Sequence, residues 1–149
     1  MRVPGWIGPI AGLLVLTSCF SSLEPDIDSI VLDMEVDRTT VSFGEVLTVT
    51  LTATNQGPRV VTLSGPSECL LYFEVYPESS GGGPVYRSIN HCAGGIVTEE
   101  LAEGETKRQT FTWDASTDAG ARVPSGRYAI RGLARVTYSP QAILIVLVE

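Results

Sequence analysis

Few residues of this chain have side chains suited to chemistry: three cysteines, Cys19, Cys69 and Cys92, and a single histidine, His91. A cysteine can bind a metal, form a disulfide or be modified on its sulfur. His91 stands directly beside Cys92, and the set lacks the ligand spacing of a zinc site. We therefore predict no metal site, and the role of each cysteine depends on its surroundings.

Cys19 follows a segment with the layout of an export signal. Arg2 supplies a positive start, and residues 6–16 are mostly apolar and uncharged. An apolar run of about ten residues is typical of a secretory signal and too short for a bilayer, which needs about 20. Leu16-Thr17-Ser18-Cys19 matches a lipobox, in which a cysteine receives diacylglycerol. We predict removal of residues 1–18 and lipidation of Cys19. The alternative is an ordinary signal in which Cys19 is incidental.

Residues 19–28 have the composition of a tether, being short, polar and interrupted by Pro25. About ten extended residues reach at most about 35 Å. Several lipid chains on Cys19 would supply the stable anchoring that a single chain does not. We therefore expect membrane lipid as a partner, and a domain over residues 29–149 that lies close to the membrane of the cell envelope.

Export also bears on the two remaining cysteines, since disulfides persist outside the cytosol. We predict that Cys69 pairs with Cys92, and the alternative is two buried free thiols. Closing a loop of this length stabilises a fold by about 3 kcal/mol in the chain-entropy model.

Catalytic groups are sparse. His91 is the only histidine available as a base, and no serine lies in a G-x-S-x-G elbow. Glu99 and Glu100 are neighbours and would point to opposite faces of a strand. We predict a protein that is not an enzyme and needs no cofactor.

One acidic loop allows a calcium hypothesis. Asp114, Ser116 and Asp118 are spaced two apart, as oxygen ligands often are in calcium loops, and Gly120 follows. The glycine falls one place late, however, and no bidentate glutamate follows. We therefore favour a hairpin here over a metal site.

Charge excludes some partners. Without Arg2 the mature chain keeps nine Lys and Arg against 17 Asp and Glu, a net charge of −8. Nucleic acid requires a basic face, and anionic lipid attracts basic segments. We predict no nucleic-acid partner and no electrostatic docking to lipid.

The apolar pattern has a period of two almost throughout, which indicates an all-β domain. Residues 47, 49, 51 and 53 are apolar and alternate with threonines. Many short strands separated by turn signals indicate a β-sandwich or barrel. The predicted strands are residues 29–37, 46–54, 59–64, 69–76, 84–90, 95–101, 106–113, 128–137 and 142–148. The last is apolar on both faces, so it is either a covered central strand or an edge that needs a partner.

Two stretches resemble a known family. The first comprises residues 51–57, 61–63 and 72–76, and the second comprises residues 101–105, 111–114 and 120–128. Together they resemble the BsuPI family, named for an intracellular proteinase inhibitor. The resemblance covers roughly residues 47–133 and implies a single immunoglobulin-like antiparallel β-sandwich. Its motif residues here are Asn55, Gly104, Trp113, Gly120, Pro124, Gly126 and Tyr128, and the two cysteines and the lipid anchor would mark an exported version.

These motif residues have structural roles by their chemistry. Gly104 and Gly126 suit positive φ, and Pro124 presets φ for a turn. Trp113 and Tyr128 are large anchors for a core.

The sequence thus predicts a lipid-anchored, non-catalytic sandwich that binds an unknown protein partner. One alternative is a proteinase inhibitor, implied by the resemblance, in which Arg59, Arg87 or Arg122 enters a protease pocket. Another is an assembly component that pairs through residues 143–148.

Overall fold

The computed structural model describes residues 29–149 except positions 43, 80 and 138. The signal segment, Cys19 and the tether lie outside the described residues. The described elements are β1 (Ile30–Val36), β2 (Thr40–Val41), β3 (Leu47–Asn55), β4 (Val61–Pro66), β5 (Leu71–Pro77), β6 (Tyr86–Arg87), the 3₁₀ helix η1 (Ser88–His91), β7 (Ile96–Leu101), β8 (Thr106–Trp113), β9 (Gly126–Ala134) and β10 (Gln141–Val148). The prediction of an all-β fold is confirmed.

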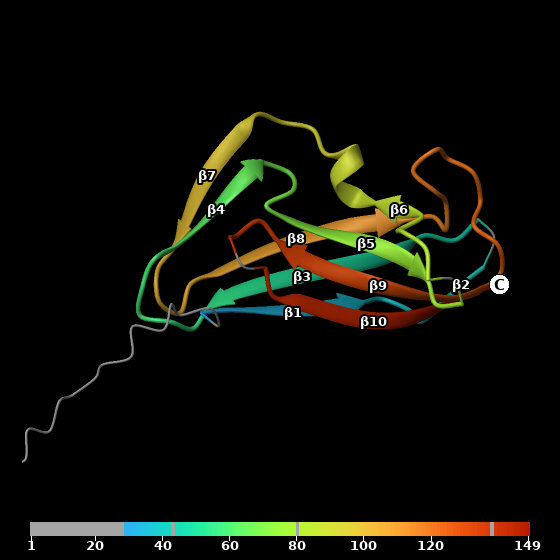
Figure 1. The fold of residues 1–149 in the computed structure, drawn as a ribbon, viewed down its shortest axis with the longest axis horizontal. Helices are drawn as coiled ribbons and strands as arrows, with labels where there is room; N and C mark the ends of the chain where they lie inside the picture. Colours follow the sequence, from blue (N-terminus) through green and yellow to red (C-terminus); the bar gives the residue numbers. More distant parts are fainter. Residues whose placement is uncertain (1–28, 43, 80, 138) are drawn as a thin grey trace, which may run out of the picture.

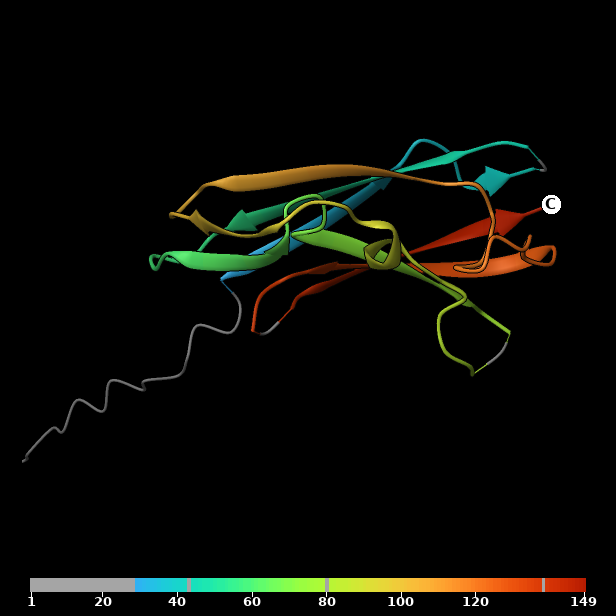
Figure 2. The same ribbon diagram turned by 90° about the horizontal axis from the view of Figure 1, so that it is seen from above.

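Two sheets pack face to face as a sandwich, which Figure 2 shows edge-on. The first sheet has the order β1-β3-β8, and the second has the order β2-β10-β9-β5-β6. A separate ribbon of two strands, β4 and β7, extends beyond them at one end (Figure 1). The chain passes from β1, antiparallel to β3, to β2, parallel to β10, so its first segment contributes to both sheets. This arrangement is an immunoglobulin-like sandwich.

The alternation of β3 explains how the core forms. Leu47, Val49, Leu51 and Ala53 are fully buried, while the threonines between them are only partly buried. Side chains on one face of each sheet meet those of the other in a core that includes Phe73, Trp113 and Ile130. Gly132 of β9 makes room for β3, because a Cβ at Gly132 would lie 2.6 Å from the Leu51 side chain.

Strand register defines the two ends of the sandwich. Ile30 pairs with Asn55 at one end, called here the Ile30 end. Leu47 pairs with Trp113, and Val148 with Gly126, at the opposite end, called here the Glu149 end. The connections at residues 37–46, 78–85 and 114–125 all lie at the Glu149 end (Figure 1).

The prediction of a strand over residues 84–90 is wrong in its second half. Only Tyr86–Arg87 are strand, and Ser88–His91 form η1. The disulfide at Cys92 and the hydrogen bonds that the Asp118 carboxylate accepts turn the chain there, and neither constraint appears in a local sequence pattern. The short strand β2 was not predicted, since two residues are too few to show alternation.

In the described part of the chain, no helix is long and apolar enough to cross a membrane.

Candidate protein-binding face

The outer face of the first sheet is polar. Its outward side chains include four threonines on β3 and three on β8, and Thr50 and Thr110 lie across from each other with their hydroxyl oxygens 3.2 Å apart. On β1 the outward residues include Asp33 and Glu35, both exposed. A face of threonines and carboxylates is typical of a solvated sheet surface.

The outer face of the second sheet has a different character. Most of its outward side chains are apolar, aromatic or basic, and one is a carboxylate. They are Ile143, Ile145 and Leu147 on β10, Arg127, Ala129, Arg131 and Leu133 on β9, Tyr72, Glu74 and Tyr76 on β5, and Arg87 on β6. Gln141 of β10 and Thr40 of β2 are uncharged polar residues on the same side. We call this surface the β10–β9–β5 face. Ile143 is 61% exposed and Leu147 is 37% exposed. Tyrosine, arginine and clustered apolar residues are the composition of protein interfaces.

Two arginine–tyrosine pairs repeat along this face. The guanidinium of Arg131 lies 4.6 Å from the ring centre of Tyr76, and that of Arg135 lies 5.6 Å from the ring centre of Tyr72. In each pair the arginine stands two residues beyond the register partner of the tyrosine. The Nε atoms of both arginines are buried and have no hydrogen-bond partner in the described part of the chain. Arginine and tyrosine are both enriched among the residues that anchor interfaces.

Glu74 is held in place by its neighbours on the same face. The Tyr76 hydroxyl donates a 2.6 Å hydrogen bond to Glu74 Oε2, and Arg87 Nε lies 3.4 Å from Glu74 Oε1. Partial burial and this bond to Glu74 together raise the pKa of Tyr76. The Tyr76 hydroxyl therefore stays protonated at physiological pH and keeps its hydrogen bond to Glu74.

The edge of the second sheet is partly open at β10. This strand pairs with β9 along its length, but with β2 only at Leu147 and Val148. Its even-numbered residues, Val146 and Val148 among them, point into the core, and its odd-numbered residues point outward. Of the two expectations for this strand, the structure thus favours a sheet edge over residues 141–146, with one face packed and one exposed.

The disulfide between Cys69 and Cys92 is formed, with the two Cα atoms 6.0 Å apart, and the pairing prediction is confirmed. It joins the start of β5 to the end of η1. Ser88 is buried, and its Oγ accepts a 2.9 Å hydrogen bond from the backbone N–H of Phe73. The disulfide region therefore fixes η1 against β5.

Asp118 braces the other side of η1. Its carboxylate accepts hydrogen bonds from Arg87 N at 2.9 Å and Asn90 Nδ2 at 2.7 Å, and His91 Nε2 lies 3.2 Å away. Partial burial opposes ionisation of Asp118, but these bonds outweigh it and lower its pKa. The loop in which we considered calcium instead uses Asp118 to hold the chain.

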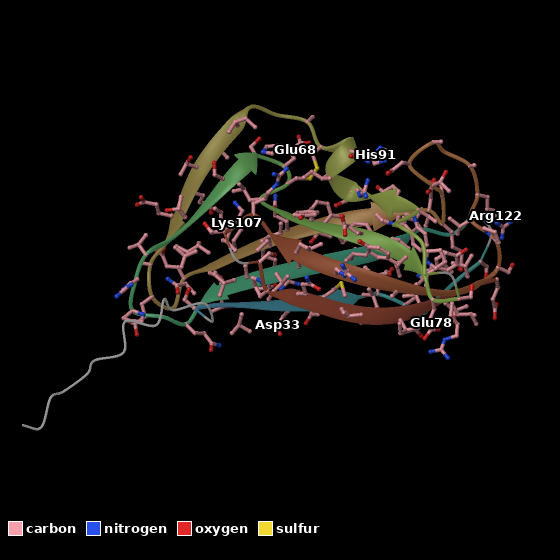
Figure 3. All side chains as sticks on the ribbon, in the orientation of Figure 1. Asp33, Glu68, Glu78, His91, Lys107 and Arg122 are labelled. Carbon is pink, nitrogen blue, oxygen red and sulfur yellow. A yellow bond between two sulfur atoms is a disulfide. The ribbon has the colours of Figure 1, made fainter. Side chains whose placement is uncertain are left out.

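A polar pocket of about 610 Å³ lies beside the disulfide. Glu68 and His91, labelled in Figure 3, are among the residues that line this pocket. Its polar groups hold backbone: Glu68 accepts from Ala93 N at 2.9 Å, and Gln109 accepts from Leu71 N at 2.6 Å. Within residues 29–149, apart from positions 43, 80 and 138, no group of three or more His, Cys, Asp or Glu side chains is placed to hold a metal. The pocket is thus built mainly from residues that shape the fold.

The motif residues make structural contacts at one or the other end of the sandwich. Asn55 and Gly104 meet at the Ile30 end, where Gly104 N donates a 2.7 Å hydrogen bond to Asn55 O. Gly104 has a φ of 80°, which an L-residue adopts only with strain. Asn55 is fully buried. These two residues have a structural role in the β3–β4 and β7–β8 connections.

The other motif residues lie toward the Glu149 end. The rings of Trp113 and Tyr128 are 6.1 Å apart and meet edge to face. The Tyr128 hydroxyl donates a 2.7 Å hydrogen bond to Pro124 O, a tyrosine corner of the kind found in immunoglobulin-like sandwiches. Gly120 turns the loop with a φ of 78°, and Gly126 begins β9 with a φ of 152°. These residues close the core at the Glu149 end and have structural roles.

The three arginines considered for an inhibitor do not come together. Arg59 lies in the β3–β4 connection at the Ile30 end. Arg87, on β6, forms an ion pair with Glu74 of β5. Arg122 lies at the Glu149 end, where its Nη2 donates a 2.7 Å hydrogen bond to Glu149 O (Figure 3). Each would have to act alone.

Comparisons with known proteins concern the fold. No protein-family model matches the chain, and no curated protein matches it. Among solved structures, the alkylpurine DNA glycosylase AlkC of Pseudomonas fluorescens, bound to DNA, matches with a TM-score of 0.54 at 12% identity, over 81% of this chain and 30% of that one. The β-glucosidase EmGH1 of Erythrobacter marinus matches with a TM-score of 0.53 at 13% identity, over 81% of this chain and 15% of that one. This chain therefore corresponds to a minor part of each enzyme, and at this identity the likeness shows the fold alone.

Sequence analysis did not identify the β10–β9–β5 face. A signal was present, because Arg127, Arg131 and Arg135 are spaced by four, as are Tyr72 and Tyr76. On a strand this spacing places each set on one face. Which face points outward follows only from how the sheets pack.

Proposed function

We propose that this protein is a lipid-anchored lipoprotein of the cell envelope, and that its sandwich binds a protein partner through the β10–β9–β5 face without catalysis. The observation that carries the proposal is the difference between the two outer faces. One is threonine-rich and polar, and the other combines exposed Ile143 and Leu147 with tyrosines and arginines. Monomeric proteins rarely expose such clustered apolar residues without a use.

The position of the tether is consistent with this proposal. The predicted lipobox ends at Cys19, and the first described strand, β1, begins at Ile30. With the Ile30 end toward the membrane, the strands lead away from it and the loops of the Glu149 end are farthest out. The β10–β9–β5 face then lies along the side of the domain, open to a neighbouring protein.

A crosslinking experiment tests the proposed face. A photoreactive amino acid is placed at Ile143, or at Thr110 on the polar face as the matched control, in cells that make the full-length protein. We expect one discrete adduct from position 143 and none from position 110. The added change Ile145→Glu should abolish the adduct, since it places a charge beside the contact. Equal crosslinking from both positions, or an adduct indifferent to Ile145→Glu, would refute the proposal.

Proteinase inhibition, implied by the BsuPI resemblance, is a second candidate, supported by the bracing of the loop that carries Arg122. Backbone hydrogen bonds link Thr117 to Ala121 and Val123 to Ala115, and Asp118 N donates to Val85 O. Inhibitors need a rigid exposed loop. Stoichiometric inhibition in a panel of serine and metalloproteases, lost on Arg122→Ala, is the expected result for this function.

Assembly through β10 is a third candidate, supported by the open edge over residues 141–146. An open edge can accept a strand from another chain. Light scattering of the full-length protein at high concentration tests it, because a monodisperse monomer would count against pairing between copies.

A further inference from the structure

The second sheet carries a distinct pocket of about 520 Å³ where β4, β5 and the end of β9 meet. The residues that line it include four with hydroxyl groups, Thr62, Ser64, Thr137 and Ser139. Tyr72 and Arg135 also line the pocket. None of the described residues that line it is a carboxylate. The residues that line the pocket therefore carry one positive charge and no negative charge, although Glu100 on β7 is the register partner of Thr62.

Arg135 is held firmly at this pocket. Its backbone N–H donates to Leu70 O at 2.8 Å, and its carbonyl accepts from Ser64 N at 3.3 Å. The guanidinium lies over the Tyr72 ring, and Gly65 is close to the same side chain, since a Cβ there would lie 3.3 Å from Arg135 Nε. The charge is therefore preorganised, which lowers the cost of binding.

The guanidinium of Arg135 forms no hydrogen bond with the residues that the structure describes. Its Nε is buried without a partner, and the guanidinium forms no ion pair with any described carboxylate. The hydroxyls of Thr62, Ser64 and Thr137 likewise make no hydrogen bond to the described residues, while Ser139 is engaged with Ala134 and Pro140. A guanidinium stays charged at any physiological pH. The pocket thus presents one fixed positive charge and several free donors.

Arg131 provides an internal comparison. It also stacks on a tyrosine and has a buried Nε, but its register partner is Glu74. The residue opposite Arg135 is Leu70, whose carbonyl oxygen accepts the hydrogen bond from Arg135 N. Arg131 therefore has a carboxylate opposite it within the sheet, and Arg135 does not.

We propose that the Arg135 pocket binds a carboxylate, through the guanidinium of Arg135 and the hydroxyls of Thr62, Ser64 and Thr137. A single cation matches the single charge of a carboxylate, whereas phosphate, with a charge near −2, would favour a second cation. Because Tyr72 belongs to both the pocket and the β10–β9–β5 face, the carboxylate comes from an acidic side chain or C-terminus of the protein partner. In that last respect the inference rests on the proposed function.

Nuclear magnetic resonance of the ¹⁵N-labelled full-length protein in detergent tests the pocket with small probes. Sodium acetate should shift the amide signals of Ser64 and Thr137 along a saturable curve, and sodium chloride at equal ionic strength should not. A short peptide with glutamate and isoleucine should bind more tightly than acetate, because it also reaches the neighbouring face. Saturation by phosphate alone, or equal responses to acetate and chloride, would refute the carboxylate site. Binding of acetate with no gain from the peptide would refute a polypeptide source.

Three variants locate the effect. Arg135→Gln should weaken acetate binding by about ten- to a hundredfold, the value of a charged hydrogen bond. Arg108→Gln, on the polar face of the first sheet, is the matched control and should leave acetate binding within about twofold, because that residue does not line the pocket. Gly65→Ala keeps the charge but crowds Arg135 Nε, so it should also weaken binding.

The spectrum of each variant reports whether it folds. Equal losses from Arg108→Gln and Arg135→Gln would show a diffuse charge effect and refute the pocket. Crosslinking from Ile143 without acetate binding would refute only this inference, and the reverse result would refute only the proposed face.

Discussion

The side-chain amide of Asn55 donates a 2.8 Å hydrogen bond to the carbonyl oxygen of Leu101, 46 residues further along the chain. The same nitrogen donates to Arg59 O at 2.7 Å, and Asn55 Oδ1 accepts from Gly57 N at 3.0 Å. One buried side chain thus joins the β3–β4 connection to the end of β7.

Replacement of Asn55 by alanine is expected to destabilise the fold by about 2–4 kcal/mol, because a buried carbonyl oxygen, a partly buried one and a buried N–H lose their partner. Urea unfolding of the variant measures this. Gln56→Ala, at an exposed neighbour, is the control and should change stability by less than about 0.5 kcal/mol. Equal stability of the two variants would show that Asn55 is not a structural tie.

The disulfide should contribute about 3 kcal/mol to stability through the chain entropy of the unfolded state. We expect the double variant Cys69→Ser, Cys92→Ser to lose about this amount in urea unfolding. Mass spectrometry of the wild-type protein should show the loss of two hydrogens. Alkylation of both cysteines without prior reduction would contradict the pairing.

Acid should weaken the contact between Asp118 and η1. Because the pKa of Asp118 is lowered in the folded state, its contribution is present above the ordinary aspartate value of about 3.9 and is lost as the pH falls through the lowered pKa. Asp118→Asn should therefore reduce stability at neutral pH and flatten the dependence of unfolding free energy on pH below about 4. Asp33→Asn, on the exposed face of β1, is the matched control. If the loss of stability below about pH 4 were the same in Asp118→Asn as in the wild type, other carboxylates would be its cause.

Lipidation of Cys19 predicts how the protein fractionates. Cys19→Ser should move the protein from the membrane fraction to the soluble fraction of cell extracts, because stable anchoring requires the lipid chains. Metabolic labelling with an alkyne fatty acid should mark the wild type and not the variant. A labelled Cys19→Ser protein, or one that remains with the membrane, would contradict the predicted anchor.

The sequence by itself determined the all-β class, because alternation along a strand is a local property that survives in any sandwich. Residues 47–54 and 106–113 show it, and both are strands in the structure. It also determined the disulfide, since only two cysteines remain after Cys19. The strand predicted over residues 84–90 is limited to Tyr86–Arg87, because Asp118 and the disulfide act on the following segment from far along the chain.

Only the tertiary structure decided which side chains share the outer surface of the second sheet. β10 is apolar on both faces, so its sequence cannot show which face is covered, and sheet packing leaves Ile143 exposed. The Arg135 pocket likewise arises because β4 lies beside the end of β9, although the two are about 70 residues apart in sequence. Local periodicity defines strands, but which side chains share a surface depends on contacts between segments that are distant in the chain.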